Sequence, residues 1–201
     1  MTDFVHRYIP GRAQRTLLLL HGTGGNESSL LSVAKVVDSG ASILAVRGNV
    51  LENDMPRFFR RFAEGVFDVE DLKLRSNELA DFVVEASSGY GFSLGSVVSL
   101  GYSNGANIAA SMLLLRPETM NGAVLLRAMV PFEPASLPNL RGKKVFISSG
   151  SRDPVVPEDN ARRLEGILRR AWADVTTNWE LADHGLAMDE LQRVKSWLTR
   201  L

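Results

Sequence analysis

The clearest chemical signal in the sequence is a serine enclosed by two glycines. The stretch Gly101-Tyr102-Ser103-Asn104-Gly105 matches G-x-S-x-G and separates an apolar run from an almost wholly apolar segment. In α/β enzymes this pattern forms a nucleophile elbow, a sharp turn between a strand and a helix that exposes the serine hydroxyl. Glycines are needed on both sides because a Cβ atom there would collide with neighbouring backbone. We predict that Ser103 is a nucleophile, in preference to a serine that only caps the following helix.

A serine hydroxyl needs a base, which is most often histidine. The chain has three histidines. His184 lies in "LADHGLA", in the predicted loop between the last strand and the last helix. His6 falls on the first predicted strand, and His21 closes a buried apolar run, where we expect it to support a loop. We therefore predict that His184 is the base.

The third member of such a triad is an acid that lies between the serine and the histidine in chain order. Asp153, in "SRDPVVP", follows a predicted strand and meets this requirement. It would fix the tautomer of His184 and stabilise its imidazolium form. Asp183 competes for the role, but it is adjacent to His184 and poorly placed to reach that residue's own Nδ1. The other interpretation of Asp153 is an Asp-Pro turn residue.

Acyl transfer also needs hydrogen-bond donors for the developing oxyanion. The glycine-rich stretch "HGTGGNES", residues 21–28, follows an early buried strand and precedes a predicted helix. We predict that the oxyanion hole consists of the backbone N–H groups of Thr23 and Asn104. Gly24 would let the loop approach the substrate, and Tyr102 would lie near the floor of the binding pocket.

The motifs of nucleotide and metal sites are missing. The glycine-rich loop lacks the third glycine of a dinucleotide fingerprint, since Glu27 stands there, and the Gly142-Lys143 pair is followed by Lys144 rather than Ser or Thr. There is no cysteine and no H-E-x-x-H pattern. We therefore predict neither a metal ion nor a cofactor.

The stretch 47–71 is the least regular part of the chain and longer than a strand-to-helix connection requires. We predict that Phe58 and Phe59 form an aromatic wall beside Ser103, with Glu52 orienting an arginine. The chain has little room for a deep acyl tunnel, so we predict small esters, including esters of phenols, rather than long lipids. The alternative is a surface helix whose Phe side chains pack inward while its Arg side chains are solvated. Whether the stretch moves as a lid is left open.

The elements that must position these residues alternate along the chain. Strands are predicted at 4–9, 16–20, 41–46, 96–100, 123–126, 144–148 and 175–181. Helices are predicted at 29–37, 77–86, 104–115 and 158–171, with a further helix at the C-terminus. This alternation predicts an α/β fold with a mostly parallel central sheet, helices on both faces and no large cap domain, formed by residues 1–201 as a single domain.

The composition narrows the range of partners. Lys+Arg and Asp+Glu are equal at 23 each, so no basic excess points to nucleic acid or an anionic membrane. The run Leu17–Leu20 is too short to cross a bilayer, and the first residues lack the pattern of a signal peptide. We expect a soluble cytoplasmic protein without membrane insertion. A homodimer is compatible with the sequence, which does not fix the oligomeric state.

Together these motifs resemble the phospholipase/carboxylesterase branch of the α/β-hydrolase family. The resemblance rests on "LLLLHGTGG", "RGNV", "RFFRR", "GYSNGANIA", "SRDPVVP" and "DHGL", and it is strongest to small bacterial esterases, some of which are associated with hydroquinone and quinone responses. It implies a cofactor-free serine carboxylic-ester hydrolase with the triad at Ser103, Asp153 and His184. Many relatives have H-G-x-G-D at the oxyanion loop, whereas this chain has Gly25 in place of the aspartate.

The leading hypothesis is therefore a carboxylesterase that acts on a small-molecule ester. Thioesterase or lactone (dienelactone-type) hydrolase activity would use the same residues on another substrate. A non-catalytic small-molecule receptor on a hydrolase fold is the alternative from another class, and the occupied triad positions argue against it. No repeat, tail or charged patch favours a structural protein.

Overall fold

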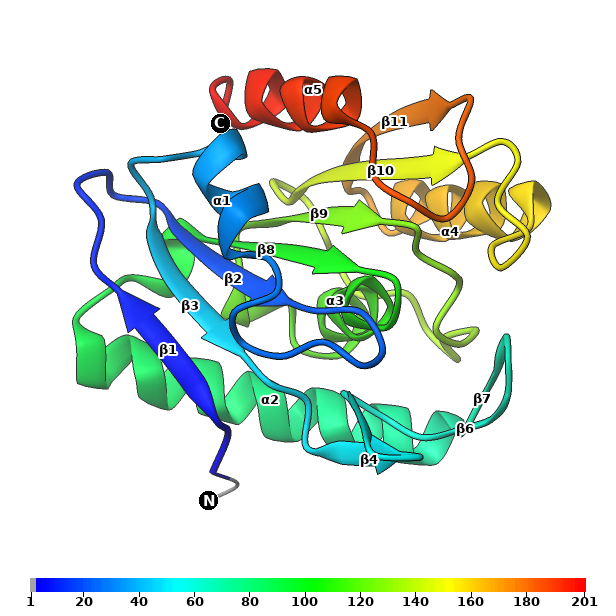
Figure 1. Ribbon diagram of the computed structural model, residues 1–201, viewed down its shortest axis with the longest axis horizontal. Helices are drawn as coiled ribbons and strands as arrows, with labels where there is room; N and C mark the ends of the chain where they lie inside the picture. The colour runs from blue at the N-terminus through cyan, green and yellow to red at the C-terminus, as the bar shows by residue number, and fades with distance from the viewer. Residues whose placement is uncertain (1–2) are drawn as a thin grey trace.

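The computed structural model describes residues 3–201, which build a seven-stranded sheet in the order β1-β3-β2-β8-β9-β10-β11 (Figure 1). The strands are β1 (His6–Ile9), β2 (Thr16–Leu20), β3 (Ser42–Val46), β8 (Val97–Tyr102), β9 (Gly122–Leu126), β10 (Lys144–Gly150) and β11 (Asp174–Glu180). Edge strand β1 is antiparallel to β3, and the other pairings of this sheet are parallel. The prediction of a mostly parallel sheet is confirmed.

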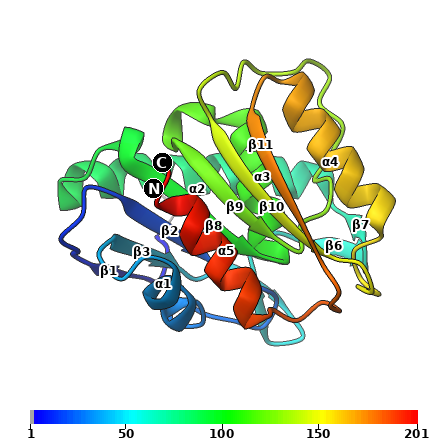
Figure 2. The same cartoon turned by 90° about the horizontal axis from the view of Figure 1, so that it is seen from above.

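Helices cover both faces of the sheet. Helices α1 (Leu31–Val37) and α5 (Met188–Leu198) lie side by side on one face, as Figure 2 shows. Helices α2 (Val69–Tyr90), α3 (Asn104–Leu115) and α4 (Glu158–Arg170) pack on the other. Two 3-10 turns, η1 (Leu94–Ser96) and η2 (Pro117–Thr119), join them to the strands. The chain thus has three layers, with the sheet in the middle.

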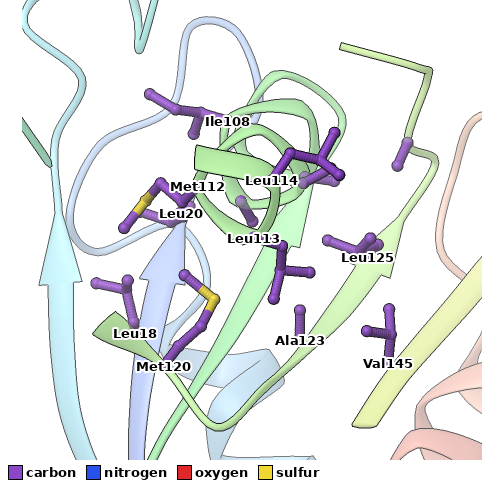
Figure 3. Close-up of a cluster of buried hydrophobic side chains, with 14 of the residues drawn as sticks. Leu18, Leu20, Ile108, Met112, Leu113, Leu114, Met120, Ala123, Leu125 and Val145 are labelled. Atoms are coloured by element: carbon purple, nitrogen blue, oxygen red, sulfur yellow. The ribbon is translucent and has the colours of Figure 1, made fainter. Parts of the chain in front are cut away.

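The alternation of side chains along β2 builds a separate core on each face. Leu18 and Leu20 belong to the cluster under α2, α3 and α4, whereas Leu17 and Leu19 belong to the cluster under α1 and α5. Successive side chains of a strand point to opposite faces, so a strand covered on both sides is apolar throughout. Figure 3 shows the first cluster, in which the apolar side chains of α3 lie over the strands. This burial anchors the helix that follows Ser103.

The predicted irregular stretch contains short hairpins instead of a surface helix. Strands β4 (Val50–Glu52) and β5 (Met55–Arg57) pair antiparallel, as do β6 (Arg61–Ala63) and β7 (Val66–Phe67). Both residues of the first turn, Asn53 and Asp54, have positive φ angles of 49° and 62°. Such a turn favours a hairpin because its twist matches that of paired strands. These hairpins do not form a cap domain over the sheet.

Helix α2 is longer than the predicted 77–86. It begins after Asp68, whose side chain accepts a hydrogen bond from the N–H of Asp71, and it ends at Gly91, which has a φ of 74°. An acceptor before the first turn and a left-handed glycine after the last are the usual signals of helix ends.

No helix in residues 3–201 combines the length and the apolar content that crossing a membrane would require.

Candidate active site

The turn at Ser103 has the geometry of a nucleophile elbow. Ser103 stands between the end of β8 and the start of α3, with φ 52° and ψ −115°. A positive φ is strained for a residue with a side chain, and strain of this kind often marks functional sites. A Cβ atom on Gly101 would lie 2.4 Å from the Gly105 carbonyl oxygen, and one on Gly105 would lie 1.9 Å from the Leu20 carbonyl oxygen. Both positions therefore require glycine, as the sequence predicts.

The structure brings the three predicted triad residues together. His184 Nε2 lies 2.9 Å from Ser103 Oγ, and His184 Nδ1 lies 2.8 Å from Asp153 Oδ2. The Asp153 side chain is completely buried, and its other oxygen accepts hydrogen bonds from the N–H groups of Val155 and Val156. With its proton on Nδ1, facing the carboxylate, the ring would have Nε2 free to accept a proton from Ser103.

Asp183, the rejected alternative, has a different role. Its Oδ1 accepts a hydrogen bond of 2.8 Å from the N–H of Gly185 and so shapes the loop that carries His184. Tyr102, which we expected near the substrate, also supports this loop. Its hydroxyl donates to the carbonyl of His184 at 2.9 Å, and it is not among the residues that line the cavity beside Ser103. Tyr102 thus holds the backbone of His184 in place.

The side chain of a buried arginine, Arg127, also holds the loop that carries His184. Arg127 Nε donates to the carbonyl of Asp183 at 3.1 Å, and its Nη2 donates to the carbonyl of Gly185 at 2.5 Å. The guanidinium also pairs with Glu190, at 2.5 Å from Nη1 and 3.1 Å from Nη2. Neither side chain is exposed to solvent. Three consecutive carbonyl groups, those of residues 183, 184 and 185, are therefore fixed by Arg127 and Tyr102.

Neither Arg127 nor Glu190 is among the predicted site residues. The signal for Arg127 was a charged residue inside the apolar run "AVLLRAMV", and the signal for Glu190 was a carboxylate beside the apolar stripe of the last helix. A buried charge needs a partner, so each position by itself is a signal that a buried side chain of opposite charge lies nearby. Their separation of many residues gave no hint that they would pair with each other.

The two predicted oxyanion donors lie on either side of Ser103. Asn104 is the first residue of α3, and the N–H groups of a helix's first turn have no partner inside the helix. Within residues 3–201 neither the Thr23 N–H nor the Asn104 N–H has a hydrogen-bond acceptor. Both residues line the cavity next to Ser103. Their N–H groups are thus available to a ligand oxygen.

His21 supports the oxyanion loop, as expected. Its ring is buried, accepts a hydrogen bond of 3.0 Å from the Gly48 N–H at Nε2, and lies 2.6 Å from the Gly22 carbonyl at Nδ1. Gly24 has a φ of 79° and donates its N–H to Pro56 in the first hairpin. Gly24 does not line the cavity beside Ser103, and its N–H holds this loop against the first hairpin.

The cavity beside Ser103 is small, about 30 Å³ in volume. Phe67 and Met129 contribute to its apolar side, and Arg57 and Arg61 to its polar side. Phe58 and Phe59, the predicted aromatic wall, are only 2% and 0% exposed and belong to the core under α2 and α3. The structure thus places both rings in the core and not along this cavity. The N–H of Phe58 instead donates to the Asn104 side chain.

Comparison with known proteins defines the class of this molecule. Residues 9–201 match the phospholipase/carboxylesterase family, and the chain belongs to it. It is therefore a hydrolase of the α/β-hydrolase superfamily, as its resemblance to that branch implied.

Individual relatives agree with this assignment. The chain is 45% identical to the putative hydrolase MhqD of Bacillus subtilis over 192 residues, which is 96% of each chain. It is 49% identical to the Bacillus cereus carboxylesterase, with a TM-score of 0.96 over 98% of this chain and 94% of the other. A carboxylesterase from Mesorhizobium loti has 29% identity and a TM-score of 0.93, over 99% and 97% of the two chains.

Proposed function

We propose that this protein hydrolyses small carboxylic esters through a covalent acyl-enzyme formed on Ser103. The observation that carries this proposal is the continuous hydrogen-bonded chain from Ser103 through His184 to Asp153, with separations of 2.9 and 2.8 Å. Ser103 itself stands in a strained turn, beside two N–H groups that have no acceptor within residues 3–201. This arrangement is the one that serine hydrolases of unrelated folds share.

The reaction follows from these contacts. Ser103 Oγ attacks the ester carbonyl carbon while His184 Nε2 accepts the serine proton, and Asp153 stabilises the imidazolium that forms. The carbonyl oxygen becomes an oxyanion, which accepts hydrogen bonds from the N–H groups of Thr23 and Asn104. One such donor is worth on the order of 3 kcal/mol. His184 then gives its proton to the departing alcohol, and a water molecule activated by the same histidine releases the acid.

The size of the cavity favours a small substrate. A volume of about 30 Å³ beside Ser103 holds a group of a few atoms and cannot enclose a long acyl chain. The rings of Phe58 and Phe59 lie in the core and do not line this cavity. Our proposal therefore keeps small esters and sets no aromatic requirement. The carboxylesterases among the relatives support an ester rather than a thioester or lactone.

A fluorophosphonate reagent tests the proposal because it reacts with an activated serine. Intact-mass spectrometry is expected to find one adduct on the wild-type protein and none on Ser103→Ala. Hydrolysis of p-nitrophenyl acetate is expected to exceed that of p-nitrophenyl palmitate. A folded wild-type protein that takes up no adduct would contradict the proposal and favour a receptor, while faster hydrolysis of the palmitate would contradict the small-substrate part.

A further inference from the structure

Two arginines on the polar side of the cavity share a single carboxylate. Arg57 Nε lies 3.1 Å from Glu52 Oε2, and Arg61 Nε lies 3.0 and 3.1 Å from the two Glu52 oxygens. Glu64 also borders the cavity, but it is exposed to solvent at its rim. The charge of Arg127, which borders the cavity too, is balanced by Glu190. This wall therefore has one more guanidinium than buried or half-buried carboxylates.

Hydrogen-bond donors are also in surplus on this wall. Arg57 donates from Nη1 to Thr23 Oγ1 at 2.6 Å and from Nε to the carbonyl of Phe59, and its Nη2 has no acceptor within residues 3–201. Arg61 Nη1 and Nη2 likewise make no hydrogen bond within residues 3–201. The amide oxygen of Asn107 accepts from the Met129 N–H, which leaves its Nδ2 as a further donor at the cavity.

The other carboxylates of the site leave these donors unsatisfied, since the exposed Glu64 forms no ion pair with them within residues 3–201. The buried Asp153 lies behind His184, and its two oxygens accept from the histidine and from two backbone N–H groups. The Arg57 side chain is only 3% exposed, so water has little access to it. Burial lowers the pKa of Arg57 to about 10, which still leaves the guanidinium charged at neutral pH. A buried charge with open donors favours a ligand that brings its own acceptors.

We propose that the substrates of this site are small esters that carry a second, free carboxylate group, which Arg57 and Arg61 bind beside Ser103. A carboxylate fits because a guanidinium can donate to it through two parallel hydrogen bonds and pairs with its charge. The apolar side of the cavity, with Phe67 and Met129, would accommodate the short carbon chain between the two groups. This inference rests on the proposed function and names the substrate class of the same site.

Matched ester pairs provide the test. We would measure kcat/KM for the monoethyl esters of malonic, succinic and glutaric acid, and for the corresponding ethyl esters in which a carboxamide replaces the free acid. The two members of a pair have nearly the same shape and differ in charge. For at least one chain length the acid is expected to be preferred about tenfold or more, because charge-assisted hydrogen bonds are roughly twice as strong as neutral ones. The preference is expected to shrink at high salt.

Two arginine variants connect the preference to this wall. Arg61→Gln is expected to bring the acid-to-amide ratio close to one, mainly through a higher KM for the acid, and Arg61→Lys to keep part of the ratio. The control is Arg60→Gln, because the Arg60 side chain is exposed and pairs with Asp68 outside the cavity. It is expected to keep the wild-type ratio.

The outcomes separate this inference from the proposed function. If fluorophosphonate labels Ser103 but every acid-to-amide ratio is one or lower, the protein is a serine esterase and the carboxylate inference is wrong. An acid preference that Arg61→Gln leaves intact would also overturn it, since the charge would then be recognised elsewhere. If Ser103 takes up no label, both proposals fail together.

Discussion

Arg127 and Glu190 form an ion pair from which solvent is completely excluded, with Arg127 Nη1 2.5 Å from Glu190 Oε1. The pair joins the end of β9 to the first turn of α5, and Arg127 also holds the backbone on both sides of His184. A buried ion pair is often no more stable than apolar side chains of similar size. Its benefit here is therefore geometric, because it fixes the loop that must place His184 within hydrogen-bond distance of Ser103.

Removal of the Arg127–Glu190 ion pair is expected to change the free energy of unfolding and kcat independently of each other. Glu190→Leu alone should destabilise the protein by about 3–5 kcal/mol, since Arg127 is left buried without a partner. The double variant Arg127→Met with Glu190→Leu should recover most of that loss but keep a low kcat, because the carbonyls of Asp183 and Gly185 stay unheld. Urea unfolding and ester hydrolysis measure the two effects. A double variant with the wild-type kcat would show that the pair has no part in positioning His184.

Substitution of a glycine in the turn at Ser103 is expected to affect stability very differently from substitution of a glycine in a helix. Gly105→Ala is expected to destabilise the protein by about 3 kcal/mol or more, because its new Cβ would lie 1.9 Å from the Leu20 carbonyl oxygen. Gly89 in α2 is the matched control, since a Cβ there meets nothing within 4 Å. Gly89→Ala should stabilise the protein by about 0.5–1 kcal/mol through its higher helix propensity. Urea unfolding of both variants checks the contrast, and equal effects would contradict the steric argument.

The contacts of the triad could be anticipated because each member follows the end of a parallel strand. The carboxyl ends of parallel strands gather at one edge of the sheet, so Ser103 after β8 and Asp153 after β10 meet there however far apart they are in sequence. The supporting contacts lacked such a rule. The hydrogen bonds from Arg127 to the loop of His184 depend on side-chain packing, which local sequence patterns do not encode.

The short hairpins of the stretch 47–71 could not be predicted for a related reason. Short strands of two or three residues leave too few positions for an alternating pattern to be detected. The pair Asn53-Asp54 was the available signal, since both residue types tolerate the left-handed conformation that this turn adopts. Phe58 and Phe59 were placed at the pocket because aromatic residues near a nucleophile suggest a binding wall. Their burial depends on packing against residues of α2 and α3, which are distant in the sequence.

Asp153→Asn tests the role of the buried acid. The amide can no longer balance an imidazolium, and it can donate a hydrogen bond to Nδ1 and so select the wrong histidine tautomer. A loss of about 10⁴-fold in kcat is expected, with little change in KM, because the side chain does not line the cavity. Steady-state kinetics on a small p-nitrophenyl ester measures it. A loss smaller than tenfold would mean that Asp153 only shapes its turn.

His21 connects the oxyanion loop to the stability of the protein at low pH. Its Nε2 accepts the Gly48 N–H, so the folded protein requires a neutral ring, and burial lowers its pKa below the ordinary value of 6.5. Below about pH 6.5 the unfolded chain binds a proton at this histidine that the folded protein does not bind. Folding free energy is therefore lost as the pH falls through the window between the unfolded and the folded pKa, and His21 contributes no pH dependence above it.

The expected consequence is that His21→Gln has a flatter stability profile than the wild-type protein between pH 7.5 and 5. The variant is less stable at pH 7.5, because it lacks the buried imidazole ring, whose centroid lies 4.8 Å from the centroid of the Phe58 ring. Since every other titrating group is common to both proteins, subtraction of the two profiles isolates the proton of His21. Urea unfolding at half-unit pH steps measures the difference. A constant difference across the range would show that His21 takes up a proton as readily in the folded state as in the unfolded chain.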